Sequence, residues 1–326
     1  MDYVVRRNNL KELPHSLDYV SCLLHLSVCG IFGLLWMLLL HKFNGFCFLF
    51  SVRSSVVLKA DISTISEHLD IGLTTGYLGS LTTFSGWNQK MLDLSVNGQW
   101  VYASLGFLCG KHIVSWPNWF CPITFSPLLW NLMEKVTTAK GFKGLLGDLK
   151  SRSTNQWSLK SYKSHLAVMI ALLLVLGVLL VASGLLDAKE FRNGGSEAHL
   201  WLACFLAPLG VWIRWTLTRL NGRGIGKSGQ FNWVPLGTLA ANIGAASMMA
   251  ALATVNTKNC DTVASGMQFG LLGCMSTVST FMAEFHTMSP SNQLLRAFAY
   301  AAVTVVPSFG IGILIYCIPV WTKRCN

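Results

Sequence analysis

Apolar residues are concentrated along the chain in blocks, separated by segments rich in polar and basic side chains. A helix needs about 20 apolar residues to cross the ~30 Å hydrocarbon layer of a membrane. Blocks of this length occupy 18–40, 68–90, 99–115, 165–186, 198–220, 232–255, 263–283 and 295–320. A weaker block near 43–58 is interrupted by Arg53, Ser54 and Ser55. The pattern predicts an all-α polytopic membrane protein of about nine helices, the second of them degenerate.

The composition supports a membrane protein. Hydrophobic residues make up 52% of the chain and charged residues 12%, whereas soluble domains carry about 25% charged residues. The predicted partner of this surface is therefore the lipid bilayer. The ten cysteines are scattered, without a CxxC pair. Cysteine inside apolar blocks behaves as a small hydrophobe, so neither a disulfide framework, a zinc site nor an organic cofactor is predicted.

The net charge of +11 comes mainly from basic residues between the apolar blocks, which crowd 116–163 and 219–227. Loops rich in Lys and Arg stay on the cytoplasmic side. Nine helices with a cytoplasmic N-terminal segment (1–17) bring both loops inside, whereas eight helices do not. The basic balance therefore indicates orientation and not nucleic-acid binding.

Enzyme motifs are missing from the sequence. The eight histidines are dispersed, and no HExxH, GxSxG or paired carboxylates occur. The segment 221–229, NGRGIGKSG, resembles a phosphate-binding loop but has Asn221 where that motif requires its first glycine. We therefore predict neither an enzyme nor a nucleotide site.

The chain contains an internal repeat. Residues 72–87, GLTTGYLGSLTTFSGW, correspond to residues 266–281, GMQFGLLGCMSTVSTF, at an offset of 194 (266 minus 72). Each unit has an even number of helices, so the extra apolar helix between them inverts the second unit. The prediction is two inverted four-helix repeats joined by a linking helix, a pseudo-dimer within one chain, with its site at the repeat interface. The predicted regions are the cytoplasmic N-terminal segment (1–17), the degenerate first repeat (18–115), the basic cytoplasmic loop (116–163), the linking helix (164–187) and the second repeat (195–322).

The third helix of each repeat combines glycines with hydroxyl side chains. Gly72, Gly76 and Gly79 allow close helix approach and are followed by Thr82 and Ser85. A membrane helix can break at such a place, which frees carbonyls that neighbours or an ion must satisfy. The alternative is a tightly packed helix pair whose hydroxyls bond to their own backbone.

Aromatic pairs follow the hydroxyls in both repeats. Phe84 and Trp87 are three residues apart and share a helix face, as do Val278 and Phe281. Because the edge of an aromatic ring is electropositive, such rings can line the path of a small anion. Ordinary packing is the alternative.

Three polar residues of the second repeat lie within apolar blocks. Asn242, one turn after Thr238, either bonds to another helix or offers its NH₂ group to an anion, because an unpaired amide there is costly. A charge such as Arg214 inside a membrane block is functional by default. Arg214 is also near enough to the cytoplasmic end of its block to extend its side chain toward water.

Three segments together resemble the signatures of the Fluc/CrcB fluoride channel family. They are 76–88 (GYLGSLTTFSGWN), 233–246 (WVPLGTLAANIGAA) and 269–281 (FGLLGCMSTVSTF). The nearest resemblance is to the plant-like eukaryotic fluoride export proteins, which fuse two such units through a connecting helix. It extends over about 61–110 and most of 195–320.

The resemblance implies a pore and an ion site. The implied fluoride-pore residues are Phe84, Trp87, Asn242, Thr238, Val278, Phe281, Ser279, Thr277 and Arg214. A central structural sodium is implied on the backbone carbonyls of Gly79, Thr82, Gly273 and Ser276. No other cofactor is implied.

The first repeat departs from the family pattern. Met37 stands where the second repeat has Arg214, and 41–60 contains no Gly-Thr-x3-Asn motif. Residues 112–131, with three prolines, also look foreign to the family. We interpret the chain as a splice form or imperfect gene model of a fluoride exporter.

The expected function is passive export of fluoride, which confers fluoride resistance, across what we expect to be the plasma membrane. HF crosses membranes as a neutral acid and traps F⁻ in the cytoplasm, and a negative-inside potential expels it without ATP. One alternative is a non-conducting splice isoform or structural membrane protein. Another is a proton-coupled anion transporter, for which Glu284 and His286 are the candidate titratable residues.

Overall fold

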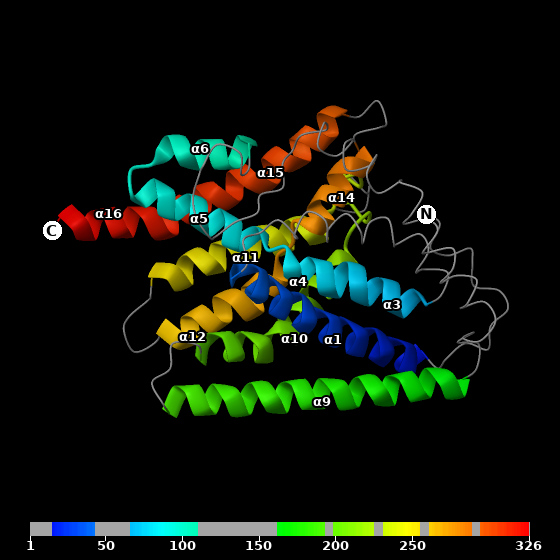
Figure 1. The fold of residues 1–326 in the computed structure, drawn as a ribbon. Helices are drawn as coiled ribbons and strands as arrows, with labels where there is room; N and C mark the ends of the chain where they lie inside the picture. The colour runs from blue at the N-terminus through cyan, green and yellow to red at the C-terminus, as the bar shows by residue number, and fades with distance from the viewer. Residues whose placement is uncertain are drawn as a thin grey trace, which may run out of the picture.

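A computed structural model describes residues 15–42, 66–109, 162–192, 198–224, 231–254, 261–288 and 294–325. Helices joined by short turns make up these residues, and no strand occurs among them (Figure 1). Most of the N-terminal segment 1–17, the weak block at 43–58, the loop 116–163 and the foreign segment 112–131 lie outside the described residues. What the sequence predicts of them stays a prediction.

Within the described residues, five helices are long and apolar enough to cross a membrane. They are α1 (His15–Lys42), α9 (Tyr162–Arg192), α10 (Ala198–Thr218), α11 (Leu236–Thr254) and the continuous run of α15 (Leu294–Gly312), η4 (Ile313–Cys317) and α16 (Ile318–Cys325). Their positions match the apolar blocks. The all-α polytopic membrane class is therefore confirmed.

The third helix of each repeat is broken, which is one of the two possibilities that its glycines and hydroxyls left open. The first consists of α3 (Glu67–Ile71), the π-helix η1 (Gly72–Leu78), α4 (Gly79–Leu81) and, after the extended residues Thr82 and Thr83, α5 (Phe84–Val96). The second consists of α12 (Asp261–Gly266), the π-helix η3 (Met267–Leu272), α13 (Gly273–Met275) and, after the extended Ser276, α14 (Ser279–Met288). The π-helix and the break recur at equivalent positions, so the internal repeat extends to local conformation.

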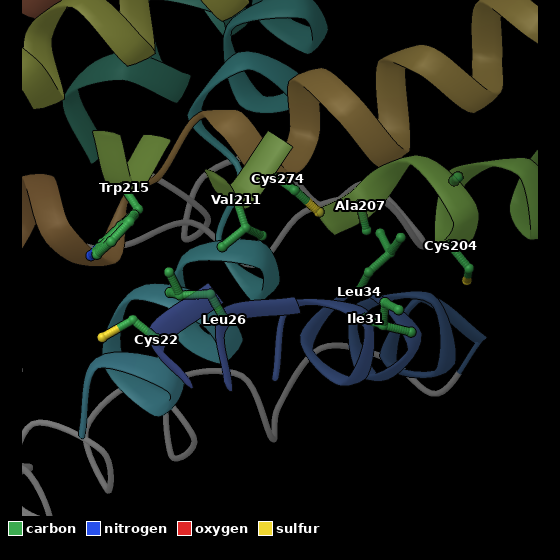
Figure 2. Packing of buried hydrophobic residues seen from close by; sticks show 10 residues of the cluster. Cys22, Leu26, Ile31, Leu34, Cys204, Ala207, Val211, Trp215 and Cys274 are labelled. Carbon is green, nitrogen blue, oxygen red and sulfur yellow. The ribbon is translucent and has the colours of Figure 1, made fainter. Parts of the chain in front are cut away.

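Glycines let the broken helices pack closely on their neighbours. A Cβ atom at Gly76 would come within 3.1 Å of the Leu26 carbonyl oxygen on α1, and one at Gly270 would overlap the backbone of Ala203 on α10. Each π-helix therefore packs on the first helix of its own repeat, as small residues in membrane helices allow. Between the two repeats, α1 and α10 share an apolar cluster that includes Leu26, Ile31 and Val211 (Figure 2).

The two broken helices enter the bundle from opposite ends (Figure 1). The N-terminal ends of α1, α3 and α9 lie together, because His68 Nε2 is 2.9 Å from Asp18 Oδ1 and its ring lies 6.3 Å from that of His165. The start of α12 lies at the other end. Helix α9 runs along the edge of the bundle against α1 and α10 and exposes a row of apolar side chains, as a lipid-facing helix does. Helix α6 (Trp100–Cys109) follows α5 after a short turn and packs on it.

Candidate functional site

The two breaks meet at the centre of the bundle and bond to each other. The backbone N–H of Val278 donates to the Thr82 carbonyl (3.0 Å), and that of Ser279 to Thr82 Oγ1 (2.9 Å). In the opposite sense, the N–H of Ser85 donates to Ser276 Oγ (3.0 Å). The first N–H groups of a helix lack partners within it. The hydroxyl at each break therefore accepts one N-terminal N–H of the helix that follows the other break, beside the local caps Thr83 and Thr277.

The sequence alternative, in which hydroxyls bond to their own helix, holds in part. Thr82 Oγ1 also donates to the Leu78 carbonyl at 2.9 Å. Ser276 Oγ instead lies 2.8 Å from Ser85 Oγ and 3.1 Å from Thr83 Oγ1, both from the first repeat. The hydroxyls thus serve both the local backbone and the junction between repeats.

Arg214 joins the two breaks. Its side chain is fully buried, so the alternative in which it extends toward water is wrong. Nη1 donates to the carbonyls of Cys274 and Ser276, the latter at 3.2 Å, and Nη2 donates to the carbonyl of Thr75. Carbonyls at the C-terminal ends of helices carry partial negative charge, which favours a cation there. The guanidinium therefore lies at the C-terminal end of α13 and also binds a carbonyl of the π-helix η1 in the other repeat.

The arginine site is asymmetric, because only one of the two repeats supplies an arginine. The guanidinium lies directly against Gly79, where any side chain would collide with it. Met37, the counterpart of Arg214, packs against the apolar cluster between α1 and α10. Only the second repeat therefore contributes an arginine at this position of the repeats.

Aromatic rings from both repeats meet next to the breaks. The centroids of Phe84 and Phe281 lie 6.2 Å apart, and both side chains are buried. Trp87 meets Phe84 edge-on at 5.7 Å, as expected for two rings on one face, and Phe281 lies 5.2 Å from Tyr300. Val278 packs in the same cluster as Phe281 and Tyr300. The candidate pore rings thus meet both within the first repeat and between the repeats.

Asn242 holds the backbone that follows the second break. Its Nδ2 donates to the Thr277 carbonyl (3.0 Å), and its Oδ1 accepts from the Thr277 N–H (2.8 Å). Of the two alternatives for Asn242, the structure therefore contains the hydrogen bonds to another segment and not a free NH₂ group. Thr277 Oγ1 lies 3.1 Å from Ser279 Oγ, so these two buried hydroxyls form a pair beside the amide.

Thr238 belongs to a polar cluster that we call the carboxylate cluster: Asn221, Thr238, Glu284 and Tyr300. Glu284 Oε1 accepts from Thr238 Oγ1 (2.7 Å) and Asn221 Nδ2 (3.0 Å), and Oε2 accepts from the Tyr300 hydroxyl (2.7 Å). Sequence reasoning named Glu284 for a rival function and missed Asn221 and Tyr300 as partners. One signal was available, because Glu284 is the single acidic residue after Asp261.

A line of buried polar groups continues from Tyr300 along α15, and we call it the hydroxyl line. Thr304 and Ser308 follow at intervals of four residues and are fully buried. Their hydroxyls donate to the carbonyls of Tyr300 (2.8 Å) and Thr304 (2.7 Å). Asn88, one turn after Phe84, donates to the Ser308 carbonyl at 3.4 Å. Sequence reasoning missed these residues, although their i, i+4, i+8 spacing in an apolar helix is a recognisable signal.

We call the carboxylate cluster, the hydroxyl line and Asn88 together the polar seam, and it meets the aromatic rings where Tyr300 lies 5.2 Å from Phe281. Buried polar side chains in membrane helices usually face the bundle interior and mark the route of a solute. Among the described residues, no group of three or more His, Cys, Asp or Glu side chains is arranged to hold a metal ion. Fold and seam define a polytopic membrane protein with a buried polar interior between its two repeats.

Comparison with known proteins gives the family. The CrcB-like protein, Camphor Resistance (CrcB) family profile matches residues 201–316. Fluoride-specific ion channel FluC 2 of Staphylococcus haemolyticus is 35% identical over 121 residues, which cover 36% of this chain and 89% of that protein. The chain therefore belongs to the CrcB/FluC fluoride channel family.

Further relatives carry the same name. Fluoride-specific ion channel FluC of Burkholderia lata is 32% identical over 36% of this chain and 87% of that protein, and FluC of Bordetella pertussis is 34% identical over 33% and 82%. No solved structure matches the chain. The matched profile includes Arg214, Asn242 and Phe281, whereas Phe84 and Asn88 lie in the other repeat.

Proposed function

We propose that this chain is a passive fluoride channel whose path follows the polar seam. The observation that carries the proposal is the meeting of Phe84 and Phe281 across the repeats, beside the hydroxyl line of Thr304 and Ser308. The FluC relatives support fluoride as the ion. Fluoride is strongly hydrated, so a path for it must replace water with other donors. Ring edges, hydroxyls and amides are the donors that this seam offers.

The carboxylate cluster is the proposed cytoplasmic entrance. Its residues come from the turn after α10 (Asn221), the first turn of α11 (Thr238), the middle of α14 (Glu284) and the second turn of α15 (Tyr300). Two hydroxyls and one amide converge there on the carboxylate of Glu284. When the carboxylate moves aside, these donors are available to an incoming anion. Fluoride then takes the place of the Glu284 carboxylate on these donors. The donors are therefore hydrogen-bonded both before and after the ion enters.

Beyond the proposed entrance, the hydroxyl line offers hydroxyl groups that can rotate to donate a hydrogen bond to the ion. Thr304 and Ser308 donate to carbonyls of their own helix, and a hydroxyl can rotate about its C–O bond toward another acceptor. The edge of Phe281 lies between these hydroxyls and the breaks in this proposal. Its ring adds electropositive edge atoms but no fixed charge. A fixed positive charge at this place would hold the ion too tightly for conduction.

The proposed direction is outward, driven by the membrane potential. One charge gains about 2.3 kcal/mol per 100 mV, so a negative-inside membrane expels fluoride without a nucleotide. Fluoride resistance, a eukaryotic setting and the plasma membrane are parts of the same proposal. The second repeat carries the path. In the first repeat, the 194-residue offset puts Lys90 where Glu284 stands and Gly106 where Tyr300 stands.

A structural sodium fits the chemistry of the junction between the breaks. The carbonyls of Thr82 and Ser276 each accept one hydrogen bond, from Val278 and Arg214, and a carbonyl oxygen has two acceptor positions. Sodium would be held by these carbonyls with those of Gly79 and Gly273. Unwound backbone carbonyls are the usual sodium ligands in membrane helices. The ion would add positive charge between the half-helices, beside Arg214.

The test is fluoride release from proteoliposomes that contain this chain, read with a fluoride electrode and with chloride as the control ion. We expect selective fluoride release that Phe281→Ile abolishes and that needs no pH gradient. Release that depends on a proton gradient would favour the proton-coupled transporter. No release from correctly inserted protein would overturn the channel and favour a non-conducting isoform. The first repeat is consistent with that outcome, because it has Lys90 in place of Glu284 and Met37 in place of Arg214.

A further inference from the structure

Asn221 uses every hydrogen-bonding position of its side chain in one place. It lies in the turn that follows α10. Its Oδ1 accepts from the backbone N–H groups of Gly237 (2.7 Å) and Thr238 (3.2 Å). Its Nδ2 donates to Thr238 Oγ1 (3.1 Å) and to Glu284 Oε1 (3.0 Å). A side-chain amide has two donor and two acceptor positions, and here all four are filled.

The start of α11 lacks a cap of its own. The residues that precede it, Val234 and Pro235, carry no side-chain oxygen, although the first N–H groups of a helix need acceptors. Asn221 supplies the acceptor from a different helix. Gly237 permits this close approach, because a Cβ atom at that position would overlap the Leu217 carbonyl at the end of α10 and lie 2.9 Å from Asn221 Oδ1.

The same amide orients the two groups at the proposed entrance. The Thr238 hydroxyl accepts from Asn221 and donates to Glu284, so the direction of its proton follows from its neighbours. The Glu284 oxygen that receives this proton also receives the second N–H of Asn221. Of the residues at the entrance, Asn221 alone bonds to the α11 backbone, the hydroxyl and the carboxylate within the described contacts.

We propose that Asn221 is a positioning residue, which sets the Thr238 hydroxyl and the Glu284 carboxylate for fluoride entry without touching the ion. This inference rests on the proposed function. Loss of the Asn221 NH₂ group releases Glu284 and Thr238 from their shared donor. Fluoride capture then weakens, whereas the aromatic rings and the hydroxyl line beyond the entrance are unchanged. The half-saturating fluoride concentration is affected more than the maximal flux.

Two substitutions separate positioning from capping and from charge. Asn221→Asp keeps an oxygen for the α11 N–H groups, since Asp is a good cap, but removes the NH₂ group. Asn221→Ser removes it without adding charge. Asn97→Asp is the matched control, because Asn97 also lies in the turn after a helix and is exposed.

The flux experiment measures half-saturating fluoride in proteoliposomes. We expect Asn221→Asp and Asn221→Ser each to raise it by about tenfold or more, as the loss of one hydrogen bond to a charged group predicts, with maximal flux changed less. Asn97→Asp is expected to match the unchanged protein. A rise with Asn221→Asp alone would assign the effect to charge. No rise with either would overturn the inference.

A second measurement does not depend on conduction. Asn221→Asp puts two carboxylates together and lowers Tm in detergent, whereas the double substitution Asn221→Asp with Glu284→Gln restores a donor–acceptor pair. We expect the double variant to regain most of the Tm that the single variant loses. Additive losses would overturn the inference even where flux persists. Absent flux from the unchanged protein, with Tm recovery intact, would contradict the proposed function alone.

Discussion

Thr82 and Ser276, which occupy equivalent positions in the two repeats, each cap the helix that follows the break in the other repeat. The N–H of Ser279 reaches Thr82 Oγ1 and the N–H of Ser85 reaches Ser276 Oγ. The exchange fixes the two half-helices α5 and α14 to each other through side chains that also terminate α4 and α13. Because the same break occurs in both repeats, the two copies bind each other and form the interface between the repeats.

This exchange predicts the effect of Ser276→Ala. The substitution removes the acceptor of the Ser85 N–H at the start of α5 and one hydroxyl partner each of Ser85 and Thr83. We expect a loss of about 1–2 kcal/mol of stability, the usual cost of a lost cap, measured as Tm in detergent.

Ser247→Ala is the matched control for the capping prediction. The Ser247 hydroxyl donates to the Ile243 carbonyl of its own helix and contacts neither break. Its removal is expected to leave Tm nearly unchanged. Equal losses from both substitutions would contradict the cross-capping role of Ser276.

Arg214 predicts a larger effect. Replacing it with Met, the residue at its counterpart position 37, leaves the carbonyls of Thr75, Cys274 and Ser276 without their donor. Each orphaned buried group costs about 1–3 kcal/mol, so we expect Arg214→Met to abolish the yield of monodisperse protein in size-exclusion chromatography. Arg214→Lys keeps the charge but not the planar fork, and is expected to give an intermediate yield.

Arg219→Met provides the comparison for Arg214. The Arg219 guanidinium is exposed and lies 4.0 Å from the centroid of the Trp215 ring. Removing such a contact costs about 0.5–1 kcal/mol at an exposed site. Normal folding of Arg214→Met would contradict the assignment of its guanidinium to the breaks.

The fold was largely predictable because its signals are local. Membrane blocks follow from apolar length. The break was one of two possibilities that the glycines and hydroxyls around Gly79 and Thr82 left open. The π-helices before the breaks were not predictable, because no residue type marks them. The opposite directions of the two broken helices were predictable, because one extra helix between two units of even helix number reverses the second unit. The position of that predicted linking helix matches α9.

The site was predictable in its residues but not in its pairings. Spacing shows that Phe84 and Trp87 share a face, but it carries no information on contacts between Phe84 and Phe281, which are 197 residues apart (281 minus 84). Asn221 shows the same limit. In sequence it is a residue of a basic turn, and its role arises only when α11 and α14 converge on it.

Sodium predicts a stability difference between salts. If the carbonyls of Thr82 and Ser276 hold sodium, binding to the folded state raises Tm with sodium concentration. We expect a higher Tm in sodium chloride than in N-methylglucamine chloride at equal ionic strength. Gly273→Ala is expected to reduce the difference, since its Cβ would lie 3.2 Å from the Gln268 carbonyl oxygen and disturb this turn. Identical Tm values in the two salts would show that Arg214 alone supplies the positive charge.

The hydroxyl line predicts that conduction depends on Thr304 and Ser308 more than folding does. Thr304→Val keeps the shape of the side chain, and the hydroxyl it removes bonds only to its own helix among the described contacts. The folded state therefore loses little, whereas an ion passing α15 loses a donor that replaces water. We expect fluoride flux to fall about tenfold, equivalent to ~1.4 kcal/mol, with Tm changed by a few degrees at most.

The combined substitution Thr304→Val with Ser308→Ala tests whether the two hydroxyls act in sequence. Two donors met one after the other lower successive barriers, so the double variant is expected to conduct less than either single variant. Thr216→Val is the control, because the Thr216 hydroxyl also bonds to its own helix, at Ile213, but lies on an exposed face. If the double variant retains the flux of the unchanged protein, fluoride does not pass along α15. The rings of Phe84 and Phe281 would then be packing between the repeats and not the wall of a path.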